Sequence, residues 1–239
     1  MTNVIAMTVR GRQDLTDMCL RTAAETIGDE VVKVCLVDAG EGRDKANVER
    51  LYASVANSGL TLMYMHKPAC GISEGWNTAI RKLSDWPDVN CWVLNNDVEF
   101  RKAGWLRLLE DRLRVPGTGM VGCYGMSVFG WPFVTGGIWG FRLDAIPAEN
   151  GKILDERFNY SLQDVDLSIR LARMGYAVTH VPGLEHGDDP YLVHGVSQTG
   201  LALHGSEEQL RKLREPERRA FIDKWGRKDG KKGYAEVAE

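Results

Sequence analysis

Three short apolar runs of this chain each end in side chains that can bind a ligand. Thr8 and Arg10 close the first run, Asp38 the second, and Asn95 and Asp97 a later one. Carboxylate and amide oxygens suit a hard divalent cation, which keeps further positions for phosphate oxygens. One such coincidence is a weak signal, but three in register predict a shared site.

The apolar pattern also predicts the elements that position these side chains. Four short β-prone runs, typical of buried strands, span residues 4–9, 31–37, 60–65 and 91–94. Helical spacing of apolar residues covers the intervening segments 14–27, 45–58 and 72–83. Such alternation indicates an α/β doubly wound sheet with parallel strands and crossover helices. In that architecture, ligands bind at the carboxyl ends of the strands.

The second half of the chain has less regular patterns. Residues 117–141 are rich in glycine and aromatic side chains, which is typical of strands and close-packed loops. Residues 161–174 predict a further helix, and residues 176–181 predict a strand. No linker and no internal repeat divides the sequence.

The C-terminal segment differs from the rest in its charge. From Ser206 the chain is highly charged with a helical pattern, and residues 227–239 are typical of a frayed tail. We therefore expect one domain over residues 1–204 and a charged helical extension over residues 205–239. Its basic side chains suit a phosphate-rich surface, either anionic lipid or nucleic acid. The interspersed acidic residues favour a solvated helix instead.

Composition limits the class of protein. The 239 residues are 44% hydrophobic and 26% charged, with a net charge of −3, which is typical of a globular protein and gives no bulk signal for nucleic-acid binding. Five cysteines are scattered, with Cys35 and Cys91 inside apolar runs, so we expect a reducing compartment. No apolar run reaches the roughly 18 residues of a membrane helix. We expect a soluble, cytoplasmic protein.

Four blocks of the sequence are similar to motifs of one enzyme family. Residues 33–45 (KVCLVDAGEGRDK) resemble a strand that ends in Asp, and residues 71–80 (GISEGWNTAI) resemble a helix entry that carries Asn. Residues 92–100 (WVLNNDVEF) resemble a strand that ends in a DxD-type motif. Residues 158–176 (FNYSLQDVDLSIRLARMGY) resemble an acidic helix followed by Gly-Tyr. With these blocks in family order over residues 3–195, the chain resembles GT-A fold glycosyltransferases of the family-2 type.

The resemblance implies a Rossmann-like GT-A fold with a mixed sheet. It also implies an inverting, metal-dependent glycosyltransferase that moves a sugar from a nucleotide-diphosphate sugar to an acceptor hydroxyl. The acceptor would be a glycan or, if the basic C-terminal segment binds nucleic acid, a hydroxylated base in modified DNA. Mn²⁺ or Mg²⁺ would neutralise the leaving diphosphate, and a carboxylate would take the proton of the acceptor hydroxyl.

The metal site follows from the same resemblance. Asp97 matches the carboxylate that reaches the metal, and Asn95 stands where a second Asp is common. Family members often carry a metal-binding or phosphate-facing histidine after the strand that follows the acidic helix, and His186 or His194 matches that position. Taken alone, the stretch from Asn95 to Asp97 is also typical of a turn that ends a strand.

The resemblance also implies a set of donor contacts. Asp38 would meet the nucleobase or ribose, and Trp139 would stack on a sugar or base. The ordinary alternatives are a solvated turn at Asp38 and a tightly packed strand around Trp139. The implied donor contacts are Thr8, Arg10, Asp38, Asn77, Asn95, Asn96, Gly137 and Trp139.

One carboxylate matches the family's catalytic base. This is Asp164, with Gln163 at the position where Glu is common. A competing explanation is local, because Ser161 and Asp164 have the spacing of a capping box at a helix start. Asp166 lies about 200° further around a helix, so it would not share a site with Asp164. Its spacing to Arg170 predicts a structural ion pair.

Two other functions compete with glycosyl transfer. The amides Asn95 and Gln163, at positions where acids are common, are compatible with a sugar-nucleotide binding protein that lacks catalysis. A sugar-phosphate nucleotidyltransferase has a similar fold, but residues 8–12 are too poor in glycine for its phosphate loop. The sequence leaves the sugar, the nucleotide, the acceptor and the oligomeric state open.

Overall fold

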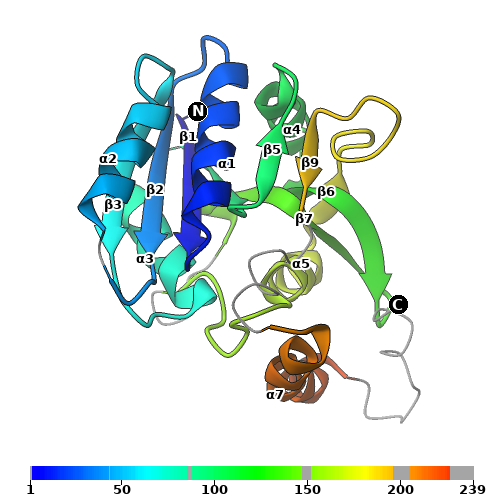
Figure 1. Ribbon diagram of the computed structural model, residues 1–239. Helices are drawn as coiled ribbons and strands as arrows, with labels where there is room; N and C mark the ends of the chain where they lie inside the picture. Colours follow the sequence, from blue (N-terminus) through cyan, green and yellow to red (C-terminus); the bar gives the residue numbers. More distant parts are fainter. Residues whose placement is uncertain (1, 43, 85–87, 147–151, 196–204, 227–239) are drawn as a thin grey trace.

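The computed structural model has a mixed seven-stranded sheet covered by helices on both faces (Figure 1). It describes residues 2–42, 44–84, 88–146, 152–195 and 205–226. The strands lie in the order β3-β2-β1-β4-β7-β6-β8. Their bounds are β1 Thr2–Val9, β2 Val32–Asp38, β3 Leu60–His66, β4 Val89–Leu94, β6 Thr118–Val128, β7 Trp131–Arg142 and β8 Ala177–His180. A separate antiparallel pair consists of β5 Val98–Phe100 and β9 Leu192–His194.

The helices divide between the two faces of the sheet. Side chains of α1, α2 and α4 join one hydrophobic cluster, and side chains of α3 and α5 join the cluster on the other face. The bounds are α1 Gln13–Thr26, α2 Lys45–Ser54, α3 Ile72–Leu83, α4 Trp105–Leu113, α5 Gln163–Arg173 and α7 Glu207–Trp225. The helix expected over residues 45–58 is shorter, because Asn57 has a left-handed backbone (φ 62°) that a helix cannot contain.

The first four strands are parallel, as their alternation with helices predicted. β1 lies between β2 and β4, with Val9 opposite Asp38 and Met7 opposite Leu94. The carboxyl ends of the three strands therefore meet at one edge of the sheet. This confirms the predicted edge where the polar strand ends, which include Thr8 and Asn95, lie, but the shared site predicted for all three does not include Asp38.

A long β-hairpin extends the sheet beyond β4. β6 and β7 join through Phe129 and Gly130, which both have positive φ (51° and 78°), as two-residue hairpin turns favour. β7 pairs antiparallel with β4, and this register sets Trp139 opposite Val93. The mixed sheet that the resemblance implied is confirmed by this pairing.

The C-terminal helix α7 packs against the body of the molecule (Figure 1). Phe221 is fully buried in a third hydrophobic cluster with Phe158 and Ile169. Lys224 adds ion pairs to Asp155 (2.9 Å) and Asp166 (2.7 Å). The charged segment therefore keeps one buried face. The tail expected over residues 227–239 lies outside the described residues.

Two further expectations concern the environment of the chain. All five cysteines are free and buried, which confirms Cys35 and Cys91 as small hydrophobic core residues. Within the described ranges, we find no helix with both the length and the apolar character needed to span a bilayer.

The register of β4 and β7 demands a glycine at position 140. Gly140 lies opposite Trp92, and a Cβ there would approach Trp92 Cε3 to 2.0 Å and the Cys91 carbonyl oxygen to 2.8 Å. Trp92 is fully buried and donates its indole N–H to Asn3 (3.0 Å), so the ring has no room to move. Gly140→Ala should lower the free energy of unfolding by about 1–3 kcal/mol.

Denaturant unfolding measures this effect. Gly42→Ala is the matched control, because a Cβ at Gly42 meets no atom within 4 Å, and its midpoint should match that of the parent chain. Equal midpoints for the two variants would contradict the β4–β7 register.

Candidate functional site

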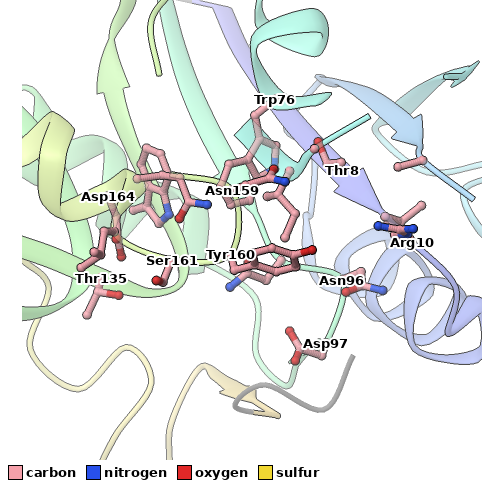
Figure 2. A pocket seen from close by; sticks show the side chains of 18 of the residues that line it. Thr8, Arg10, Trp76, Asn96, Asp97, Thr135, Asn159, Tyr160, Ser161 and Asp164 are labelled. Atoms are coloured by element: carbon pink, nitrogen blue, oxygen red, sulfur yellow. The ribbon is translucent and has the colours of Figure 1, made fainter. Parts of the chain in front are cut away.

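A cavity of about 400 Å³ opens at the carboxyl ends of β1 and β4 (Figure 2). This volume is in the range typical of small-molecule sites. Of the twelve residues predicted from the sequence, eight line the cavity. They are Thr8, Arg10, Asn95, Asn96, Asp97, Trp139, Asp164 and His194.

Asp38 and His186 do not line this cavity. Asp38 is 4% exposed and accepts hydrogen bonds from the Tyr64 hydroxyl (2.7 Å) and the Gly40 N–H (2.9 Å). It borders a separate small hollow beside α2. His186 is exposed, and its ring lies 4.1 Å from that of Tyr124. The structure therefore separates these two side chains from the other predicted site residues.

Asn77 and Gly137 also lie outside the cavity lining. The Asn77 side chain accepts the backbone N–H of Leu154 (2.9 Å) and donates to the carbonyl of the same residue (2.9 Å). It thus ties α3 to the segment before α5. Gly137 donates its N–H to Glu185 (3.2 Å), and a Cβ there would meet the side chain of His194 at 3.2 Å. Gly137 therefore lies behind His194, which lines the cavity.

Asp97, His194 and Glu185 form a line of hydrogen bonds. His194 Nε2 lies 3.2 Å from Asp97 Oδ1, and its Nδ1 lies 3.3 Å from Glu185 Oε1. The pairing of β5 with β9 sets this geometry, because Val98 lies opposite His194. Burial alone would lower the pKa of His194, but its hydrogen bonds to Asp97 and Glu185 raise that pKa to about 9.

Glu185 is a site residue that the sequence did not reveal. Burial would raise its pKa, but the hydrogen bonds from His194, Cys123 and the Gly137 N–H together outweigh this and lower the pKa of the carboxyl. With its second oxygen on the Gly137 N–H, Glu185 fixes the orientation of the imidazole toward Asp97. Its sequence neighbours Asp188 and Asp189 are equally acidic, so nothing local distinguished it.

Asp164 lies in the first turn of α5, beside Thr135 (Figure 2). Burial raises the pKa of its carboxyl above the ordinary value, and a hydrogen bond with Thr135 opposes that shift. The competing explanation, a capping box of Ser161 and Asp164, is wrong. α5 begins at Gln163 after Leu162, which has a left-handed backbone (φ 72°) and no side-chain cap.

Asp166 forms a structural ion pair with Arg170, as the spacing of the two residues predicted. It is 1% exposed and accepts hydrogen bonds from Arg170 Nε (3.1 Å) and Trp225 Nε1 (2.8 Å). It does not line the cavity that Asp164 faces. The expectation that the two carboxylates serve different sites is therefore confirmed.

The loop before Asp164 is held by a carboxylate from α7. Glu217 is 5% exposed, and it accepts the backbone N–H groups of Asn159 (2.6 Å), Tyr160 (2.7 Å) and Ser161 (3.0 Å). Three successive N–H groups that converge on one anion form a strong local clamp. Helix α7 also lines the cavity with Leu210 and Arg214. The C-terminal segment is thus part of the site's wall.

No family model matches this chain, and no curated protein matches it either. Solved structures do match. A mannosyltransferase, PcManGT from Pyrobaculum calidifontis, in complex with GDP-Man and Mn²⁺, matches with a TM-score of 0.65 and 19% identity. The match covers 93% of this chain and 64% of the mannosyltransferase.

Two other solved structures match with lower scores. TarS from S. aureus has a TM-score of 0.54 and 13% identity over 92% of this chain and 44% of its own. The galactosyltransferase LgtC, in complex with donor and acceptor sugar analogs, has a TM-score of 0.52 and 10% identity over 82% of this chain and 88% of its own. The chain thus spans less than two thirds of PcManGT and TarS. It has the GT-A fold.

Proposed function

We propose that this chain is a glycosyltransferase that transfers the sugar of a nucleotide-diphosphate sugar to an acceptor hydroxyl, with inversion at the anomeric carbon. The observation that carries the proposal is one cavity of a GT-A fold that holds both the Asp97–His194 pair and Asp164. PcManGT, which has the same fold, is described in complex with GDP-Man and Mn²⁺. LgtC is described with donor and acceptor sugar analogs, and we propose a glycan hydroxyl as the acceptor.

The donor atoms present fit a divalent cation whose coordination the substrate completes. Within the described ranges, no group of three or more His, Cys, Asp or Glu side chains is placed to hold a metal. Asp97 offers a carboxylate on the cavity wall, and His194 would add an imidazole nitrogen once its Nε2 has released its proton. Mg²⁺ and Mn²⁺ sites of this kind use one or two protein ligands and the oxygens of substrate phosphates. When bound, the cation neutralises the leaving diphosphate.

Asp164 is the proposed general base. The acceptor oxygen forms its bond to the anomeric carbon as the bond from that carbon to the diphosphate oxygen breaks. The hydroxyl proton passes to the Asp164 carboxylate, and the electron pair of the broken bond leaves with the nucleoside diphosphate. Burial of Asp164 raises its pKa, which makes it a stronger base than an ordinary aspartate. One base is enough for this displacement, and no protein nucleophile is required.

The first test is ligand-induced stabilisation. The melting temperature should rise with GDP-mannose, UDP-glucose, dTDP-glucose or CDP-glucose in MnCl₂, and the rise should shrink in EDTA. Stabilisation by one nucleotide series supports the proposal and names the donor. The absence of any shift at millimolar donor, together with the absence of donor turnover, would refute it.

A binding protein without catalysis is the second candidate. Asn95 and Gln163 are amides at positions where the family commonly carries acids, and the Asn95 side-chain amide lies 3.3 Å from His194 Nε2. Slow hydrolysis of the donor distinguishes the two candidates. Hydrolysis that disappears in Asp164→Asn supports the enzyme, and tight donor binding without any hydrolysis or transfer supports the binding protein.

The clamp at Glu217 leads to a prediction about turnover. Glu217→Gln keeps the size of the side chain but removes the negative charge and points an N–H₂ group at one of the three backbone N–H groups. We expect kcat to fall by about 10- to 100-fold, because the loop that precedes Asp164 loses its fixed position. Initial rates at saturating donor, measured well below the melting temperature, test this.

The control for this variant is on the same helix. Glu208 is 67% exposed and pairs only with Lys212 among the described ion pairs, so Glu208→Gln should retain the parental kcat. A Glu217→Gln variant with parental kcat would show that the clamp does not position the base.

A further inference from the structure

Two residues that line the cavity each carry a buried polar atom with no hydrogen-bond partner among the described residues. The atoms are the Trp76 indole nitrogen Nε1 and the Thr8 hydroxyl Oγ1. The Trp76 side chain is 6% exposed, and Thr8 is 9% exposed. An unpaired buried donor typically costs about 1–3 kcal/mol, so native proteins keep few of them. Because both residues line the cavity, a bound ligand is a candidate for the missing partner.

Local packing keeps both side chains in place. The Trp76 ring meets Trp139 edge-on, with centroids 5.8 Å apart and an interplanar angle of 86°. Gly75 brings the backbone of α3 against Thr8, because a Cβ at Gly75 would lie 2.4 Å from Thr8 Cγ2. Figure 2 shows both labelled side chains at the cavity. The two atoms thus belong to one preformed part of the wall, which joins α3 to the end of β1.

We propose that Trp76 and Thr8 form a hydrogen-bonding subsite for an oxygen atom of the sugar nucleotide. The inference rests on the proposed function and extends it to Trp76, which neither the sequence patterns nor the resemblance singled out. An indole N–H can only donate, so its partner must be an acceptor: a hydroxyl, carbonyl or phosphate oxygen. The Thr8 hydroxyl can donate or accept.

A mutation at this subsite should weaken ligand binding without lowering the stability of the ligand-free protein. Thr8→Val removes an unpaired hydroxyl and keeps the shape of the side chain. The ligand-free melting temperature should therefore stay equal or rise, while the Kd for the sugar nucleotide increases by about 3- to 10-fold, the value of one net hydrogen bond. Trp76→Phe should weaken binding to a similar or larger extent, since it removes both the N–H and part of the ring.

Two matched control residues, one Thr and one Trp, have side chains whose polar atoms already have hydrogen-bond partners within the protein. Thr22 Oγ1 donates to the Met18 carbonyl (2.9 Å) and accepts from the Phe100 N–H (3.0 Å). Trp105 Nε1 donates to Thr26 (3.1 Å). Neither Thr22 nor Trp105 lines the cavity. Thr22→Val and Trp105→Phe should therefore lower the ligand-free melting temperature and leave the Kd unchanged, which is the opposite of Thr8→Val.

The experiment measures Kd by calorimetry for GDP-mannose, GDP, UDP-glucose and UDP, each with MnCl₂. Weaker binding of the sugar nucleotide alone assigns the contact to the sugar, and weaker binding of the free nucleotide as well assigns it to the nucleotide half. Parental Kd values in both Thr8→Val and Trp76→Phe would overturn the subsite and leave the proposed function intact. A parent chain that binds none of these four ligands, nor dTDP-glucose or CDP-glucose, and turns over no donor would overturn both.

Discussion

Asp164→Asn should reduce kcat by about 10²- to 10⁴-fold, the usual contribution of a general base, while donor affinity stays at the parental value. Asparagine has nearly the same shape and can keep the hydrogen bonds to Thr135 and to the Val165 N–H (2.9 Å). It cannot accept the proton of the acceptor hydroxyl. Initial transfer rates at saturating donor and acceptor measure the effect, and donor Kd is measured in parallel.

The pH dependence of the parent protein tests the same assignment. Burial raises the pKa of Asp164 above the ordinary value of 3.8, so the carboxyl binds a proton at a higher pH than an exposed aspartate does. Activity should fall as the pH drops through this raised pKa, because the protonated form is not a base. The residual activity of Asp164→Asn should not show this fall at low pH, which we call the acid limb of the pH profile.

The control is an exposed aspartate with a local partner. Asp111, on the surface of α4, pairs with Arg114 at 3.4 Å, and Asp111→Asn should keep both the rate and the acid limb. An Asp164→Asn variant that transfers sugar at the parental rate would remove Asp164 from the mechanism.

Asp97→Asn should lower kcat/KM by at least about 10²-fold and weaken Mn²⁺ binding in the presence of the nucleotide. The Asp97 carboxylate is 6% exposed and is placed with His194 on the cavity wall. Asparagine keeps one oxygen but loses the negative charge that attracts the cation. The paramagnetic resonance signal of free Mn²⁺ measures this binding without any need for turnover.

Glu185→Gln should have a smaller effect than Asp97→Asn. Glu185 acts through His194, and loss of such a supporting carboxylate typically costs about 10- to 100-fold in metal affinity or activity. Asp189 provides the control, because it is 82% exposed and pairs with Lys102, so Asp189→Asn should bind Mn²⁺ normally. Unchanged Mn²⁺ binding in Asp97→Asn would show that the cation uses other ligands.

The sequence contains enough local information to predict the first half of the fold. Short apolar runs and helical spacing identify β1 to β4 and the helices between them, because each pattern is complete within about a dozen residues. The carboxyl ends of parallel strands converge, so Thr8, Asn95 and Asp97 could be assigned to one edge before their distances were known. α4 was missed although Trp105, Leu109 and Leu113 have helical spacing.

The start of α5 shows how tertiary contacts override a local signal. Ser161 and Asp164 have the spacing of a capping box, yet Glu217 takes the Ser161 N–H and the chain turns left-handed at Leu162. The helix therefore begins at Gln163. Glu217 lies 56 positions from Ser161, so no local pattern could reveal the competition.

The sequence by itself determined the alternating sheet, the edge at which polar strand ends meet, and the residue types available there. Only the tertiary structure decided which side chains share the cavity. It placed His194 rather than His186 beside Asp97, gave Asn77 structural hydrogen bonds to Leu154, and brought Trp76 to the cavity. It also set Glu185 and Glu217 behind residues that line the cavity. The physical reason is the same in each case: a polar group is positioned by partners distant in sequence, and those partners meet only when the core has packed.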